Sequence, residues 1–153
     1  LSQERPDFKE NKKAILEEMN LDYVEQTVTG SNDVQQAVQS IVTRCDAIYI
    51  PTDNTFASAM PLVGSVVMES GTPVICGATG MVEAGGLITL GLNYYNLGYQ
   101  TGEMAVQVLE GADPASMPVQ SQNQYDYVVN EEMLSALGME LPQSLLEKMG
   151  DAA

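Results

Sequence analysis

Short apolar segments alternate with helical segments in this chain, and that alternation is what most restricts its fold. Residues 47–50 and 73–76 are short, continuous and apolar, which is typical of strands buried on both faces of a sheet. A helical segment over about 54–69 separates them. A strand, a helix and another strand in this order predict a crossover between parallel strands. We therefore expect an α/β fold, a three-layer lobe in which a parallel sheet lies between helices.

The other predicted elements continue this alternation. The clearest helical period covers 32–44, and Ser31 is a suitable N-cap for that helix. The glycine-rich segment 77–86 predicts a loop with one helical turn, and Pro61 predicts a kink or a fresh first turn. Further helices are expected over 7–19, 93–110, 131–137 and 143–149, and further strands over 21–28, 87–90 and 125–129.

Composition and charge exclude several function classes. The net charge is −15, from 21 acidic against 6 basic residues, so the chain lacks the basic clusters that bind nucleic acid or an anionic membrane surface. Histidine is absent and there are two cysteines, which excludes His/Cys zinc sites and Ser-His or Cys-His catalysis. We expect no metal and no cofactor. No run of 18 apolar residues is present. The chain begins at Leu1 rather than methionine, so a mature or trimmed product is expected.

The two cysteines lie at opposite ends of neighbouring predicted strands. Cys45 begins one strand and Cys76 ends the next. At a rise of ~3.3 Å per residue, those ends are about 10–15 Å apart. A disulfide tolerates roughly 7 Å between its Cα atoms. The sequence therefore predicts two free and mostly buried thiols.

Three hydrogen-bonding residues, Thr52, Asp53 and Asn54, follow the predicted strand at 47–50. Ligands of open α/β sheets bind beyond the carboxyl ends of the strands, so this position favours a ligand site. Gly77–Gly80 follow the next strand and should line the same edge. Two plainer interpretations remain open: helix capping, for which Asn54 is suited, and a glycine-rich turn.

Four segments together resemble one known family. They are AIYIPTDNTFASAMP, TPVI, GGLITLGLNYYNLGYQTGEMAVQVLEG and YDYVVNEEMLSALGMELPQSLL. In this order they resemble the substrate-binding proteins of ABC importers, specifically the family linked to tryptophan and other aromatic amino acids. The combination of PTDNT with NYYNLGYQTG is more specific than either motif alone.

The resemblance implies a type I periplasmic-binding fold, in which two lobes close about a hinge onto a ligand. Family members are about twice this length, exported and often lipidated. By this resemblance, 1–90 form the second lobe, truncated at its start, and 91–153 form the crossing segment and the C-terminal return helices. The implied function is the extracytoplasmic, non-enzymatic solute-binding component of an ABC importer. Its partners would be a small polar or amino-acid-like ligand and a permease, with membrane association only through a lipid anchor outside this chain.

The resemblance also implies a set of ligand-binding residues. A serine-rich loop of the family matches Ser2 and Glu4, but Pro6 and Asp7 depart from its pattern. CGATG departs too, since relatives carry an acidic residue near its alanine and threonine. Phe56 or Tyr94 would supply an apolar wall. The expected ligand-binding residues are Ser2, Glu4, Thr52, Asp53, Asn54, Thr55, Ala78, Thr79 and Tyr94.

Two alternatives belong to other classes. One is the ligand-sensing domain of a lac-repressor-type regulator, and the other is an enzyme on a doubly wound fold. Against the enzyme, the sequence shows no nucleophile–base pair and no dinucleotide fingerprint.

The predicted helix over 93–110 follows the expected crossing at 87–93. Its spacing of Gly98 and Gly102 predicts close helix packing. Its apolar stripe would lose its native partner without the first lobe, so we expect the helix to self-associate or to fold back on its own lobe. The stripe consists of Leu97, Met104, Ala105 and Val108.

Overall fold

A four-stranded sheet forms the centre of the molecule. The computed structural model describes residues 6–151. Strands β1 (Ile48–Ile50), β2 (Val74–Cys76), β3 (Ile88–Leu92) and β4 (Tyr125–Val129) lie side by side in that order. The pairs β1–β2 and β2–β3 are parallel, whereas β4 runs antiparallel to β3. The fold is therefore α/β with a mainly parallel sheet, as the alternation of strand and helix predicts.

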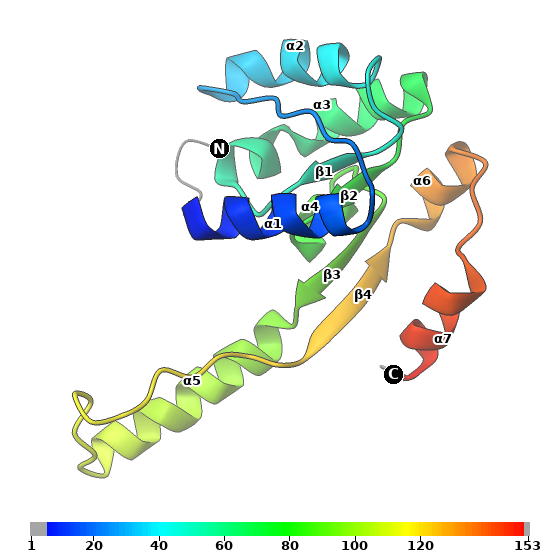
Figure 1. Ribbon diagram of the computed structural model, residues 1–153. Helices are drawn as coiled ribbons and strands as arrows, with labels where there is room; N and C mark the ends of the chain where they lie inside the picture. The colour runs from blue at the N-terminus through cyan, green and yellow to red at the C-terminus, as the bar shows by residue number, and fades with distance from the viewer. Residues whose placement is uncertain (1–5, 152–153) are drawn as a thin grey trace.

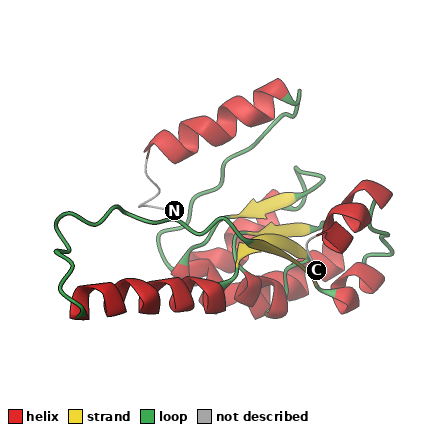
Figure 2. Ribbon diagram, turned by 90° about the horizontal axis from the view of Figure 1, so that it is seen from below, coloured by secondary structure: helices red, strands yellow, loops and turns green. Residues whose placement is uncertain are grey.

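Helices lie on both sides of this sheet. They are α1 (Pro6–Glu18), α2 (Ser31–Ile41), α3 (Asn54–Ser70), α4 (Thr79–Glu83), α5 (Tyr94–Leu109), α6 (Glu131–Ala136) and α7 (Gln143–Asp151). Figures 1 and 2 show α1 on one face of the sheet and α3 on the other, with α2 packed beside α3. The helix α3 continues through Pro61, so this proline begins no new helix.

The hydrophobic core lies between the sheet and α3. Strand residues Ile50 and Val74 point into it, and Met60 and Val63 of α3 meet them there, all nearly inaccessible to solvent. Val34 and other residues of α2 extend this core outward. Each such buried side chain stabilises the fold by roughly 1.5–3 kcal/mol. This face therefore anchors the two strands whose ends form the candidate site.

The opposite face of the sheet is more open than the sequence suggests. Tyr49 is 52% exposed, and Ile75 and Leu90 beside it are also exposed. Lys12 of α1 lies over the Tyr49 ring, 5.1 Å from its centroid. The apolar residue Ile15 of α1 nevertheless faces solvent. The expectation that β1 is buried on both faces is therefore wrong, because α1 covers it only in part.

Two local expectations near the start of the chain are also wrong. The segment 21–28 is not a strand, because it forms no ladder with a neighbouring strand. Helix α2 begins at Ser31 itself, with Gly30 as its N-cap and no side-chain capping bond. The carboxylate of Asp33 instead accepts hydrogen bonds from the backbone N–H and the hydroxyl of Thr29. These bonds lower the pKa of the Asp33 carboxyl.

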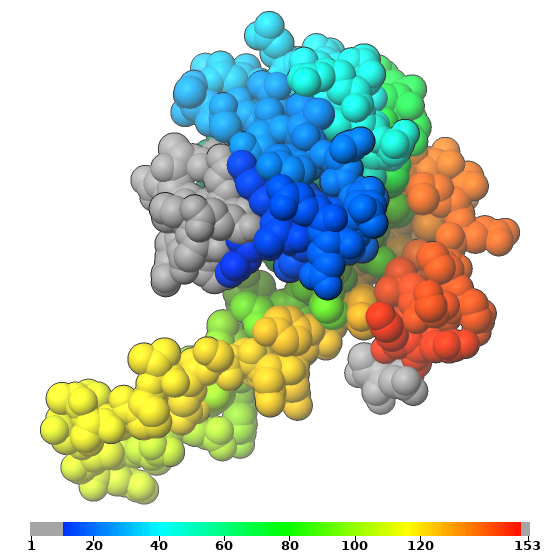
Figure 3. Space-filling view, in the orientation of Figure 1, coloured from blue at the N-terminus to red at the C-terminus, as the bar shows by residue number. Residues whose placement is uncertain are grey.

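Helix α5 projects away from the sheet as an arm, together with the segment 112–124 that returns beside it (Figure 3). Side-chain hydrogen bonds join Gln100 to Gln120 and Asn96 to Gln124 along this arm. No residue of α5 is buried, so the helix does not fold back on its lobe. Within residues 6–151, no atom lies close enough to Gly98 or Gly102 for the close helix packing that their spacing predicts.

Both cysteines are free thiols, as predicted, although Cys45 lies three residues before β1 rather than at the start of that strand. Cys76 is buried and Cys45 half-buried. Over the described part of the chain, no helix combines the length and apolar character needed to cross a membrane.

Candidate functional site

The carboxyl ends of the first two parallel strands meet at one edge of the sheet. The N–H of Gly77, just after β2, donates a 2.9 Å hydrogen bond to the carbonyl of Ile50, the last residue of β1. The hydroxyl of Thr52 donates a 3.0 Å bond to the carbonyl of Gly77. Hydrogen bonds therefore hold the loop after β1 next to the loop after β2, as the parallel arrangement predicts.

Asp53 is the N-cap of α3. Its Oδ1 accepts hydrogen bonds from the backbone N–H groups of Thr55, at 2.9 Å, and Phe56, at 3.1 Å. Both bonds go to one oxygen, and no group among residues 6–151 donates to the other oxygen, Oδ2. Asp53 therefore caps the helix in place of Asn54, and its half-buried carboxylate keeps one oxygen available as an acceptor.

The residues after Asp53 divide between surface and core. Asn54 is exposed and Thr55 half-buried, so both lie at the edge of the sheet where a ligand site is expected. Phe56 is only 6% exposed and belongs to the hydrophobic core. It cannot form the wall of a cleft, and this expectation is wrong because the first turn of α3 directs Phe56 toward the sheet.

Ala78 and Thr79 lie beside that loop. Ala78 is the N-cap of α4 and Thr79 its first residue, and both are half-buried. Gly91 of β3 lies next to Thr79, since a Cβ placed on Gly91 would come within 3.1 Å of the Thr79 hydroxyl. Tyr94 begins α5 just beyond β3 and is 60% exposed. The structure thus brings Thr52, Asp53, Ala78 and Thr79 to one edge, while Ser2 and Glu4 lie outside the described residues.

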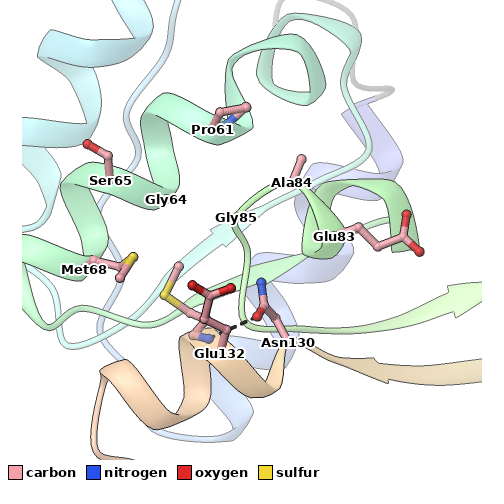
Figure 4. Close-up of a pocket in the computed structure, with 10 residues that line it drawn as sticks. Pro61, Gly64, Ser65, Met68, Glu83, Ala84, Gly85, Asn130 and Glu132 are labelled. Atoms are coloured by element: carbon pink, nitrogen blue, oxygen red, sulfur yellow. Dashed lines mark hydrogen bonds between the residues drawn. The ribbon is translucent and has the colours of Figure 1, made fainter.

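A separate surface depression of about 290 Å³ lies between α3, α4 and α6 (Figure 4). In Figure 4, the side chains of Glu83 and Ser65 point away from its centre. The Asn130 amide is already bonded, because its Nδ2 donates to the Val82 carbonyl and its Oδ1 accepts from the Met133 N–H. The polar groups of the depression therefore do not converge on a common point, and the strand edge remains the better candidate site.

The edge offers groups whose chemistry suits ligand binding. It presents a carboxylate, hydroxyl groups and a tyrosine ring, which suit hydrogen bonding and stacking. Among the described residues there is no cluster of three or more acidic or cysteine side chains suited to a metal ion. Burial raises the pKa of the nearby Cys76 thiol to about 12, which keeps it protonated and poorly nucleophilic.

The sequence analysis did not predict two features of this region. One is the close contact that Gly77 makes with Thr52; a glycine directly after a predicted strand was its only signal. The other is Asn93, which caps α5 by accepting from the Asn96 N–H and also binds Asp126. An asparagine directly before a helical pattern indicates such a cap, but nothing local indicates its second partner.

Comparison with known proteins places this chain in a family. The family model described as "ABC transporter substrate binding protein" matches residues 4–152. A tyrosine-binding protein of Clostridioides difficile is 39% identical over 121 residues, which cover 79% of this chain and 35% of that protein.

Solved structures give the same result. A ligand-free, open substrate-binding protein with adhesive properties from Clostridium difficile is 41% identical, with a TM-score of 0.72 over 92% of this chain and 49% of that one. An ABC domain in complex with L-Trp from Streptococcus pneumonia is 37% identical, with a TM-score of 0.83 over 94% of this chain and 49% of that one. The chain thus spans about half the length of these structures. It belongs to the ABC transporter substrate-binding protein family.

Proposed function

We propose that this chain supplies one lobe of the solute-binding component of an ABC importer. The proposed site lies at the carboxyl edge of β1 and β2, and its ligand is a small polar or amino-acid-like molecule. The observation that carries this proposal is the joining of the loops after β1 and β2 by the Thr52–Gly77 bond, which brings Thr52, Asp53, Ala78 and Thr79 together. The printed names of two relatives, which refer to tyrosine and L-Trp, support an aromatic amino acid as the ligand.

The chemistry of the edge suits an amino acid. The free Oδ2 of Asp53 is an acceptor for an α-ammonium group, and a charged pair of this kind makes a strong hydrogen bond. The Thr52 hydroxyl donates its proton to the Gly77 carbonyl and can accept a hydrogen bond beside it, and the Thr79 hydroxyl can donate or accept. Tyr94, with most of its ring exposed, offers a surface for an aromatic side chain. Asn54 and Thr55 complete the proposed contact set from the first turn of α3.

The rest of the binding cleft is proposed to lie on the other lobe of a longer protein, since this chain spans about half of its solved relatives. Residues 1–90 then belong to the second lobe, and 91–153 cross to the first lobe and return. The exposed arm supports this division, because Val106 and Leu109 of α5 leave apolar surface that a second lobe would cover. Closure about the crossing would trap the ligand for delivery to a permease outside the cytoplasm, without chemical change.

The test separates the two roles of Asp53. Asparagine caps helices about as well as aspartate, so Asp53→Asn in the complete protein should retain stability but lose the charged acceptor. The expected loss is about 1.5–3 kcal/mol of binding energy for L-tyrosine or L-tryptophan, roughly ten- to a hundredfold in Kd by calorimetry. Asp53→Ala should lose stability as well. Unchanged affinity in a folded Asp53→Asn protein would place the site elsewhere.

A further inference from the structure

The contact between the two loops of the candidate site depends on the absence of a side chain at one residue. Gly77 is the first residue after β2, and its carbonyl accepts the hydrogen bond from the Thr52 hydroxyl. Its N–H is bonded to the end of β1 at the same time. Gly77 therefore bonds to the end of β1 through its N–H and to the loop after β1 through its carbonyl.

No larger residue fits at this position. A Cβ placed on Gly77 would lie 2.5 Å from the backbone N of Thr52, 2.8 Å from its hydroxyl oxygen and 2.9 Å from the carbonyl carbon of Pro51. Two of these three atoms belong to the backbone, so a side-chain rotation cannot relieve the overlap. An alanine at this position must push the Thr52 loop away from the loop after β2.

The same loop is held closely on its other side, where Thr79 lies against Gly91 of β3. The segment 77–79 is thus placed between the loop after β1 and the end of β3. Any displacement at Gly77 is transmitted directly to Thr52, and the next residue is Asp53, whose Oδ1 must stay aligned with the N–H groups of Thr55 and Phe56.

We propose that Gly77 is a positioning residue of the ligand site: it touches no ligand but fixes where Thr52 and Asp53 stand relative to Ala78 and Thr79. This inference rests on the proposed function, because it assigns a role within that same site. Its consequence is specific. A methyl group at Gly77 should weaken ligand binding by displacing the Asp53 carboxylate, even though Asp53 itself is unchanged.

Gly80 provides a matched control. It lies three residues further along, in α4, and a Cβ placed on it meets nothing within 4 Å. In the complete protein, Gly77→Ala should raise the Kd for L-tyrosine and L-tryptophan at least tenfold by calorimetry. Gly80→Ala should change it less than about threefold, since measured effects of substitutions without new contacts are small.

Amide hydrogen exchange detects displacement of the Asp53 cap in the absence of a ligand. In Gly77→Ala, the amides of Thr55 and Phe56 should exchange at least fivefold faster than in the wild type, because the Asp53 cap is displaced. In Gly80→Ala they should not. A merely global loss of stability would instead also speed exchange at the buried residues Val34 and Val38 of α2, and that pattern would overturn the proposal.

The two measurements separate the proposal from the function on which it rests. Faster exchange with weaker binding in Gly77→Ala alone is the expected result. Unchanged affinity in a Gly77→Ala protein that still binds amino acids would overturn the positioning role and leave the proposed function intact. Absence of binding in the wild-type protein would overturn the proposed function, and with it the role of Gly77.

Discussion

The side-chain Nδ2 of Asn93 donates a 2.7 Å hydrogen bond to Oδ2 of Asp126, although the two residues are 33 positions apart. Asn93 stands where the chain leaves β3 for α5, and Asp126 where it re-enters the sheet in β4. The same Asn93 side chain caps α5 through the Asn96 N–H. One side chain therefore joins the outgoing segment, the returning segment and the arm.

We predict that Asn93→Ala lowers the free energy of unfolding by about 1–3 kcal/mol, from the loss of a helix cap and of a charged hydrogen bond. Urea denaturation measures this. Gln100→Ala, which removes an exposed amide pair in the same arm, should cost less than about 0.5 kcal/mol. Equal effects of the two substitutions would show that the Asn93–Asp126 bond does not hold the crossing together.

The two thiols should differ strongly in reactivity. Burial raises the pKa of Cys76 from 9.0 to about 12, so the neutral thiol persists through neutral pH and the reactive thiolate forms only at high pH. Cys45 is half-buried. We predict that iodoacetamide at pH 8 labels Cys45 at least tenfold faster than Cys76, as read by peptide mass spectrometry. After denaturation both should label alike; equal rates in the native protein would contradict the burial of Cys76.

The exposed arm predicts self-association of the 153-residue chain. The side chain of Leu109 is 87% exposed, and Val106 and Val108 are also exposed on α5. Burying one such side chain contributes roughly 1.5–3 kcal/mol, which favours pairing of arms between copies. Sedimentation equilibrium should show a concentration-dependent dimer. Val106→Asp should shift it to the monomer, whereas Met68→Asp on the distant helix α3 should not; a wild-type monomer at high concentration would refute the prediction.

The sequence predicted the elements that depend on local periodicity. The strand over 125–129 and the helix over 93–110 appear within a residue of their expected bounds, because both patterns are strong and Gly111 follows the helix. The segment 21–28 alternates loosely as a strand does, yet a strand needs a neighbour in the sheet that no local pattern specifies. The partial exposure of Tyr49 is also set by tertiary packing, since burial of that face of the sheet depends on how closely α1 packs against it.

In the candidate site too, some features follow from the sequence pattern and others depend on tertiary packing. The proposed position of the site, at the ends of β1 and β2, follows from the parallel topology. The choice of cap does not, since Asp53 and Asn54 are both good capping residues and only the extended backbone of Asp53 decides between them. The direction of Phe56 likewise depends on the rotation of α3 over the sheet.

A crystal structure of the complete protein with L-tyrosine or L-tryptophan would show where the ligand binds. We predict the ligand at the carboxyl edge of β1 and β2, with its ammonium nitrogen about 2.7–3.1 Å from Oδ2 of Asp53. The hydroxyls of Thr52 and Thr79 should lie within reach, and Gly77 should make no contact with it. A ligand seated instead in the depression beside Glu132, with the Asp53 carboxylate still facing solvent, would contradict the account.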